Sequence, residues 1–265
     1  MKKGIIVASF GTSYEKARKL SIESIENRIK EKYKDYLVLR AFTSQMIIEK
    51  LKKRDNYIVN NIKDALDEMK FNGVKDIYIQ PLHIIPGHEY EKIQKQVKIF
   101  LNQNKDYSIK IGKPLLYDDK DYKKVVRGLG LLALKPDEAI IFMGHGTDHE
   151  VDKSYEKLEK TFKEEGYENV FVATVEGKNA LEDIIPILKD REIEKIILRP
   201  FMLVAGDHAI NDMASKEEDS WRSILEREGF IVEPILQGLG EVKAIQDIYL
   251  EHLQYILNIL NKESI

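Results

Sequence analysis

The sequence predicts an α/β fold of two similar lobes, in which each lobe is a four-stranded parallel sheet flanked by helices. Three observations lead to this prediction: short apolar runs alternate with helical periodicities, the order of motifs in the first half recurs in the second, and 43% of the 265 residues are hydrophobic. A strand covered on both faces is apolar along its length, whereas an amphipathic helix repeats apolar residues every three or four positions. The alternation of the two patterns therefore favours parallel sheets over a helical bundle.

The first half of the chain contains four apolar runs with helical patterns between them. The first run, residues 5–8, is followed by Thr12 and Glu15, whose spacing is that of a capping box at the start of a helix. The remaining runs lie at residues 37–41, 74–79 and 108–111, and helical periodicity covers residues 17–33, 55–70 and 89–102. This order of elements predicts one complete four-stranded parallel sheet.

The second half repeats this order of elements. Residues 138–147 align with residues 3–12, and Thr147 and Glu150 repeat the spacing of Thr12 and Glu15. The later strands align in the same way, with residues 170–175, 195–200 and 230–234 matching 37–42, 76–81 and 109–114. The recurrence predicts an internal duplication, with an N-terminal lobe over residues 1–128 and a C-terminal lobe over residues 129–265. Residues 242–260 have the pattern of a long amphipathic helix, and the sequence leaves open whether it packs on the first lobe.

Charge and composition exclude several classes of protein. There are 42 Lys and Arg residues against 45 Asp and Glu residues, which gives a net charge of −3 and no basic excess for binding nucleic acid. The chain has no cysteine, so disulfides, thiolate metal sites and a cysteine nucleophile are excluded. No apolar run approaches the roughly 18 residues of a membrane span, and the first residues lack the apolar stretch of a signal peptide. We therefore expect a cytoplasmic protein without nucleic-acid or membrane partners, and whether it forms a homo-oligomer is left open.

The candidate site follows from what comes after each strand, because ligands of parallel sheets bind beyond the carboxyl ends of the strands. In the second half these positions hold His145, Glu176 and the pair Asp207 and His208. The corresponding residues of the first half are Phe10, Thr43, His88 and Glu89. Two imidazoles and one carboxylate suit Fe(II), Co(II), Ni(II) or Zn(II) and leave coordination positions open, as a transfer site needs.

Each of these residues also has a purely structural interpretation. His145 and Glu176 could cap the helices that follow them, and His208 could be a surface residue behind the N-cap Asp207. His83 lies in an apolar run and is predicted to be a satisfied core histidine, whereas His149 and His252 are predicted to be solvated helix positions. The sequence contains neither of the glycine-rich nucleotide-binding motifs nor the GxSxG motif of serine hydrolases. From the residues alone, a metal site and a structural role remain open.

Several motifs resemble one known family. They are residues 5–13 (IIVASFGTS), 81–89 (PLHIIPGHE), 143–147 (MGHGT), 174–177 (TVEG), 200–213 (PFMLVAGDHAINDM) and 219–221 (DSW). With them the sequence resembles, nearly end to end, the CbiK-type sirohydrochlorin cobaltochelatases of anaerobic cobalamin biosynthesis, within the class II chelatases that include ferrochelatase. The metal triad of that family falls on His145, Glu176 and His208.

The resemblance implies an enzyme that inserts Co(II) into sirohydrochlorin or precorrin-2 and releases two protons. The metal ligands would be His145, Glu176 and His208, with His145 as the first choice for general base and Glu176 as a second proton acceptor. No cofactor is expected beyond the substrate Co(II), neither ATP nor a redox group. The sequence leaves open which Lys and Arg residues bind the substrate carboxylates, and whether Co, Fe or Ni is the physiological metal. The alternatives are a sirohydrochlorin ferro- or nickel-chelatase and a non-catalytic carrier of metal or tetrapyrrole.

Contacts to the macrocycle, expected in a cleft between the lobes, are predicted for five further residues. Phe10, Leu82 and Met202 would supply apolar contacts to the ring, although a role in the core fits each of them equally well. His88 and Glu89 occupy the position that Asp207 and His208 hold in the other lobe, and are predicted to make a secondary metal or proton-exit contact.

Overall fold

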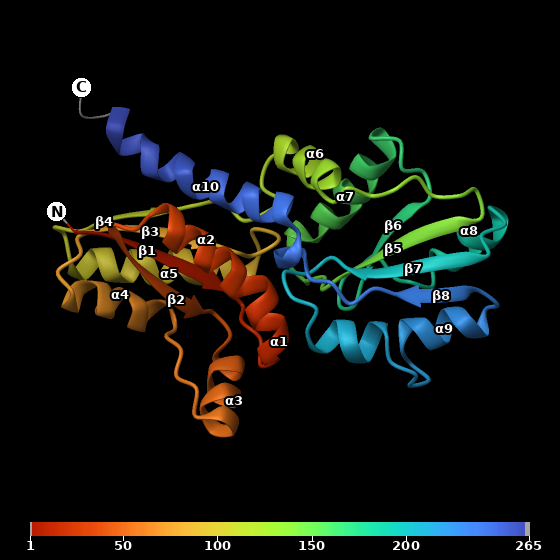
Figure 1. Cartoon of the computed structure of the whole chain (residues 1–265), viewed down its shortest axis with the longest axis horizontal. Coiled ribbons are helices and arrows are strands. Elements are labelled where there is room, and N and C mark those ends of the chain that lie inside the picture. Colours follow the sequence, from red (N-terminus) through yellow and green to blue (C-terminus); the bar gives the residue numbers. More distant parts are fainter. Residues whose placement is uncertain (1, 263–265) are drawn as a thin grey trace. The chain divides into compact units, whose positions relative to one another are not determined.

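The computed structural model describes the backbone of residues 2–262 and the side chains of residues 2–258, and it divides into two compact units (Figure 1). The first unit runs to Tyr117 and takes in the residues from Lys243 onward, and the second is Asp118–Val242. The division therefore differs from the expected one at residues 128 and 129. Helix α6 (Asp119–Gly128) packs against α7 (Lys153–Glu164) of the second unit, where the Lys157 ammonium lies 4.4 Å from the centre of the Tyr122 ring.

The first unit contains a parallel sheet of four strands in the order β2-β1-β3-β4. The strands are β1 (Lys3–Ser9), β2 (Tyr36–Phe42), β3 (Asp76–Pro81) and β4 (Ser108–Ile111). The helical elements are α1 (Glu15–Ala17), η1 (Arg18–Glu23), α2 (Ser24–Lys32), α3 (Gln45–Asp55), α4 (Ile62–Phe71), α5 (His88–Gln103) and α10 (Lys243–Lys262). Helix α10, in blue in Figure 1, packs on the first unit against β3, which is the arrangement that the sequence left open.

The second unit repeats the topology, with strand order β6-β5-β7-β8 and all pairs parallel. The strands are β5 (Glu138–Gly144), β6 (Val170–Thr174), β7 (Lys195–Pro200) and β8 (Ile231–Pro234). Besides α6 and α7, the helical elements are η2 (Glu150–Asp152), α8 (Ile185–Asp190), η3 (Ala209–Met213), α9 (Trp221–Arg227) and η4 (Leu239–Glu241). The predicted α/β fold of two similar four-stranded lobes is thus confirmed.

Burial explains why the strands have continuous apolar sequences. In β1 the side chains of Ile5 and Ile6 point to opposite faces of the sheet, and both are fully buried. The same holds for Ile141 and Phe142 of β5. Each sheet is therefore covered on both faces, and only the ends of its strands are available for a ligand.

The helix predicted around residues 55–70 is present as α4, but it begins only at Ile62, because the segment before it contains a break. Helix α3 ends at Asp55, and Asn56 follows in the left-handed conformation with φ of 51°. The chain then runs extended, and the Phe42 N–H donates a hydrogen bond of 2.8 Å to the Asn60 carbonyl oxygen before α4 begins. Asparagine tolerates the left-handed region better than most residues, so Asn56 is a local stop signal that the helical periodicity concealed.

Both predicted capping boxes are also wrong. The Thr12 hydroxyl accepts a hydrogen bond of 3.2 Å from the N–H of Tyr14, and the Thr147 hydroxyl accepts one of 3.1 Å from the N–H of His149. Each threonine therefore closes a tight turn two residues long instead of capping a helix three residues on.

His252 was predicted to be solvated, but it is buried and its Nδ1 lies 3.2 Å from the Lys113 carbonyl oxygen.

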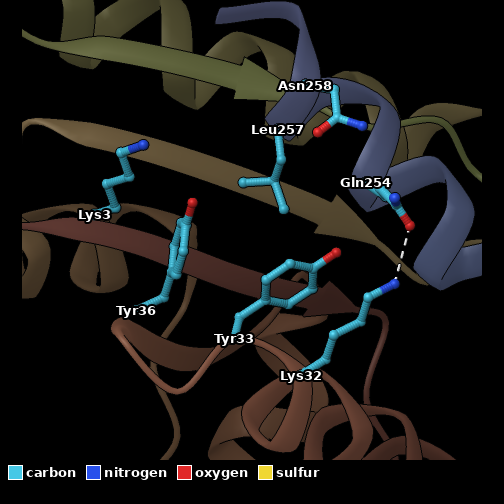
Figure 2. Close-up of a pocket in the computed structure, with 7 residues that line it drawn as sticks. All are labelled: Lys3, Lys32, Tyr33, Tyr36, Gln254, Leu257 and Asn258. Carbon is cyan, nitrogen blue, oxygen red and sulfur yellow. Dashed lines mark hydrogen bonds between the residues drawn. The ribbon is translucent and has the colours of Figure 1, made fainter. Parts of the chain in front are cut away.

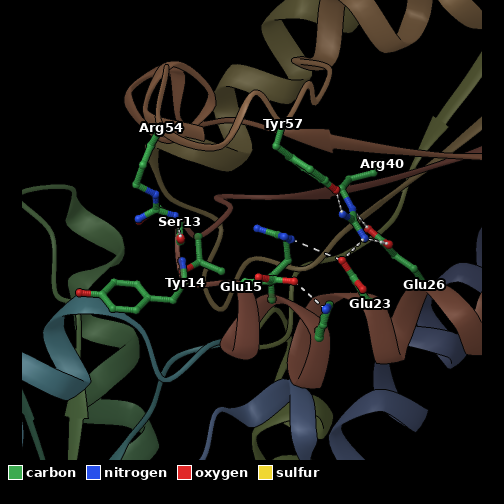
Figure 3. A network of polar contacts seen from close by, with 11 residues as sticks. Ser13, Tyr14, Glu15, Glu23, Glu26, Arg40, Arg54 and Tyr57 are labelled. Atoms are coloured by element: carbon green, nitrogen blue, oxygen red, sulfur yellow. Dashed lines mark hydrogen bonds and ion pairs between the residues drawn. The ribbon is translucent and has the colours of Figure 1, made fainter. Parts of the chain in front are cut away.

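A network of arginines fixes the segment that follows β1 (Figure 3). Arg40 of β2 pairs with both Glu23 and Glu26, at 3.2 Å from Nη2 to Glu23 Oε1 and 2.7 Å from Nε to Glu26 Oε1. The Arg18 guanidinium lies 4.5 Å from the centre of the Tyr57 ring and 3.4 Å from Glu23. Because these charged groups are largely buried, their mutual pairing is what makes their position in the interior tolerable.

Candidate metal centre

The centre begins with the loop after β5, which carries His145. Gly146 follows in the left-handed region with φ of 81°, and a Cβ at this position would lie 2.3 Å from the Gly177 nitrogen. The loop after β6, which carries Glu176, therefore approaches the first loop as closely as two backbones can. The Glu176 N–H donates a hydrogen bond of 2.9 Å to the His145 carbonyl oxygen, so the two predicted ligands are joined through their backbones.

Asp152 forms hydrogen bonds to both loops, the one that carries His145 and the one that carries Glu176. This role was not predicted from the sequence. Its side chain is buried, with 5% of the residue exposed. Oδ1 accepts a hydrogen bond of 3.1 Å from the N–H of Thr147, and Oδ2 accepts one of 2.9 Å from the N–H of Lys178. One carboxylate thus ties the His145 loop to the Glu176 loop. No motif spacing reveals this role, because it depends on two loops that are distant in sequence.

His208 is placed at the start of η3, after the long connection that follows β7. Its Nδ1 lies 2.5 Å from Oδ2 of Asp212, four residues later on the same face of the helix. A histidine that donates one ring N–H to a carboxylate presents its other nitrogen as a ligand, which is the usual arrangement around metal-binding imidazoles. Asp212 lies within a motif of the resemblance, but its spacing from His208 was not used in the prediction.

The three predicted ligands lie in the second unit, where His145 contacts each of the other two. The rings of His145 and His208 meet edge to face, with their centres 4.8 Å apart and an interplanar angle of 88°. Nδ1 of His145 lies 3.7 Å from Oε2 of Glu176. The side chains of His145, Glu176 and His208 are 44%, 61% and 31% exposed, so the cluster is accessible from solvent.

The hydrogen bonds at each imidazole indicate which nitrogen remains available. Nδ1 of His145 lies 3.1 Å from the Gly146 carbonyl oxygen, an acceptor, and Nδ1 of His208 faces the Asp212 carboxylate. We therefore assign the proton of each neutral ring to Nδ1. Nε2 of both rings then carries the free lone pair, as a divalent cation would require.

The residues predicted to contact the macrocycle are distributed over both units. Met202 is in the second unit, where it is partly buried and packs on the hydrophobic core. In the first unit, Phe10 is 42% exposed, whereas Leu82 is 1% exposed and has the core role that the sequence had left as its alternative. His88 lies exposed on the first turn of α5, and Glu89 beside it forms an ion pair with Lys92.

His83 is buried, as predicted, but it is not fully satisfied, because its buried Nδ1 has no hydrogen-bond partner. It follows β3 in the first unit, and its Nε2 lies 3.2 Å from the Thr43 hydroxyl. Burial lowers the pKa of His83 to about 4, so this imidazole is neutral in the folded protein near pH 7.

The chain is similar along its length to proteins of one known family. The family model described as cobalt chelatase (CbiK) matches residues 3–258. The sirohydrochlorin cobaltochelatase of Salmonella typhimurium is 37% identical over 266 residues, covering 100% of both chains. The sirohydrochlorin cobaltochelatase CbiKC of Nitratidesulfovibrio vulgaris is 33% identical over 268 residues, covering 98% of this chain and 92% of the relative.

Solved structures show the same fold at low sequence identity. The structure of SirB from Bacillus subtilis with Fe3+ has a TM-score of 0.64 at 14% identity and covers 96% of this chain and 95% of its own. The structure of CbiX, described as the terminal enzyme for biosynthesis of siroheme in denitrifying bacteria, has a TM-score of 0.54 at 12% identity and covers 95% of this chain and 98% of its own. Within residues 2–262, none of the helices has the length and apolar composition needed to cross a bilayer.

Proposed function

The chain belongs to the CbiK cobalt chelatase family, and on this premise we propose that it inserts Co(II) into sirohydrochlorin in cobalamin biosynthesis. The match over the whole chain to two sirohydrochlorin cobaltochelatases is the observation that carries this conclusion. Insertion replaces the two inner N–H protons of the tetrapyrrole by the metal. The protein must therefore deliver Co(II) and take up two protons.

His145, Glu176 and His208 are proposed to hold the incoming Co(II). Nitrogen and carboxylate ligands suit this metal, and the meeting of the two imidazole rings beside the Glu176 carboxylate supports the assignment. Nε2 of each histidine would bind the ion, because Nδ1 of each faces an acceptor within the protein. Three protein ligands leave coordination positions free for ring nitrogens.

The same residues would accept the protons. When Co(II) passes from an imidazole to a ring nitrogen, the Nε2 lone pair becomes free and can take the proton that this nitrogen loses. His145 is proposed as the first acceptor, and Glu176, whose carboxylate lies 3.7 Å away, as the second. The Glu176 side chain is 61% exposed, so it can pass a proton to solvent. Each insertion then moves two protons from the ring to the protein and onward to water.

The ligand set also supports release of the metal. The chain contains no cysteine, so no thiolate competes with the four nitrogens of the macrocycle for Co(II). Formation of the metal–nitrogen bonds of the product would supply the driving force, and the proposal includes neither ATP nor a redox cofactor. We also propose that the protein is located in the cytoplasm. Phe10, Met202, His88 and Glu89 stay predicted contacts of the macrocycle.

A competition assay tests this function. The full chain is supplied with sirohydrochlorin and with Co(II), Fe(II) or Ni(II), singly and in mixtures, and the absorbance of each metallated product is followed; precorrin-2 is assayed in parallel. We expect many metallated rings per chain and the highest kcat/KM with Co(II). Preference for Fe(II) or Ni(II) would identify one of the alternative chelatases. A yield limited to one metallated ring per chain would show a carrier and would contradict the proposal.

A further inference from the structure

A polar pocket lies in the first unit, at the amino ends of β1 and β2. Figure 2 shows its lining, with the Tyr33 and Tyr36 rings side by side and Leu257 of α10 above them. Lys3 opens β1, Lys32 ends α2, and the remaining lining residues are Gln254 and Asn258 of α10. The pocket is therefore built by the opposite ends of the strands from those at which ligands of parallel sheets usually bind.

Charge is the first indication of what this pocket binds. Its lining contains the two ammonium groups of Lys3 and Lys32 and no carboxylate. The Lys3 ammonium lies 6.0 Å from the centre of the Tyr36 ring, and the Lys32 ammonium lies 5.6 Å from that of the Tyr33 ring. The Lys32 ammonium donates a hydrogen bond of 3.0 Å to Oε1 of Gln254, a neutral group. The carboxyl end of α2 contributes only about half a negative charge, so the positive charge of the pocket prevails.

The Tyr33 hydroxyl is the second indication. It is buried and has no hydrogen-bond partner. A buried hydroxyl without a partner costs free energy, and such a group commonly marks a place where a ligand or water completes the hydrogen bond. Burial, with a smaller contribution from Tyr36, raises the pKa of Tyr33, so this phenol keeps its proton and can donate it in a hydrogen bond.

The size of the pocket limits the ligand. Its volume is about 170 Å³. A water molecule takes up about 30 Å³ in the liquid, so the pocket has room for about five or six waters. That space also fits a tetrahedral oxyanion with part of its hydration shell.

We propose that the pocket formed by Lys3, Lys32, Tyr33 and Tyr36 binds phosphate, either as the free ion or as the phosphoryl group of a small molecule. The two ammonium groups supply the charge, and the tyrosine hydroxyls and the amides of Gln254 and Asn258 supply neutral hydrogen-bond donors. This site is independent of the proposed cobalt chemistry, because it belongs to the first unit and the His145 cluster to the second. Failure of one proposal therefore leaves the other intact.

The test is a titration of the full chain with inorganic phosphate at constant ionic strength. Binding is measured by the thermal midpoint of the protein and by the phosphorus NMR line width of the ligand. A parallel titration with glycerol 3-phosphate distinguishes the two sources of the phosphoryl group. The charge variant carries Lys3→Gln with Lys32→Gln. Its matched control carries Lys52→Gln with Lys98→Gln, two exposed lysines of the same unit with the same change in net charge.

We expect phosphate or its ester to raise the thermal midpoint of the wild type and of the control. The charge variant should bind phosphate at least about tenfold more weakly than the wild type does. A single Tyr33→Phe variant provides a second test, because it removes only a hydroxyl that has no partner. It should weaken phosphate binding without lowering the midpoint of the phosphate-free protein. No binding by the wild type, equal binding by the charge variant, or unchanged binding by Tyr33→Phe would each overturn the proposal.

Discussion

Nδ1 of His208 lies 2.5 Å from a carboxylate oxygen of Asp212, four residues further along η3. The pair fixes the orientation of the imidazole and the nitrogen that carries its proton, so that Nε2 is left for a metal. Replacement of Asp212 by Asn should lower the affinity for Co(II) about 10- to 100-fold while leaving the fold unchanged. Isothermal titration with Co(II) measures this, and the exposed Glu217→Gln, with the same change in charge, is the control. Equal affinities for Co(II) in both variants would show that Asp212 does not support metal binding by His208.

His145 is expected to have a larger effect on turnover than on stability. Its side chain is 44% exposed and contributes little packing, so His145→Ala should keep the thermal midpoint of the wild type. Loss of the side chain proposed as both metal ligand and first proton acceptor should lower kcat at least about 100-fold. The rate of Co(II) insertion into sirohydrochlorin and the circular dichroism melting curve are measured on the same preparation. Near-normal turnover in the folded variant would exclude the role proposed for His145.

Asp152 should affect stability and turnover together. An Asn at this position can accept from only one of the two backbone N–H groups, of Thr147 and Lys178, that now bond to the carboxylate. Asp152→Asn should therefore cost about 1–3 kcal/mol of unfolding free energy, because one N–H is left unpaired in the interior. It should also lower kcat, since the His145 and Glu176 loops lose their common anchor. Denaturant unfolding and insertion assays test both parts, and a variant as stable and active as the wild type would show that Asp152 anchors neither loop.

His83 should make the stability of the protein depend on pH. Burial lowers its pKa in the folded protein to about 4, whereas an unfolded histidine titrates near 6.5. Between these values the unfolded chain binds more protons, so stability is full above about pH 6.5 and falls as the pH decreases toward 4. The contribution is roughly 3 kcal/mol. Urea unfolding of wild type and His83→Gln across this range measures it, and curves with the same pH dependence would show that His83 is not responsible.

The two sheets could be predicted from the sequence because their strands are buried on both faces and are therefore continuously apolar. The apolar run at residues 5–8 has the pattern of a covered strand, and its repeat at 138–147 indicated the second sheet. The helix start and stop signals were less reliable, because Thr12 and Thr147 satisfy neighbouring backbone groups in turns and Asn56 interrupts a periodic pattern. Local bonding of a side chain to the backbone competes with helix capping, and spacing alone does not decide between them.

The candidate site could be predicted only in part for a related reason. His145, Glu176 and His208 stand after strands, and parallel strands bring their carboxyl ends to one edge of the sheet. Asp152 acts through two backbone N–H groups that only the folded loops bring within its reach. Leu82 was expected to contact the ring or the core, and its burial to 1% exposure depends on packing that its own sequence neighbours do not reveal.

The proposed function depends most on His145, Glu176 and His208, which we propose hold Co(II) before it enters the macrocycle. Crystals of the full chain soaked in Co(II), with diffraction recorded on both sides of the cobalt absorption edge, test it most directly. One strong anomalous peak is expected within about 2.0–2.2 Å of Nε2 of His145, Nε2 of His208 and a carboxylate oxygen of Glu176. A soaked crystal whose cobalt peak touches none of these three side chains would contradict it.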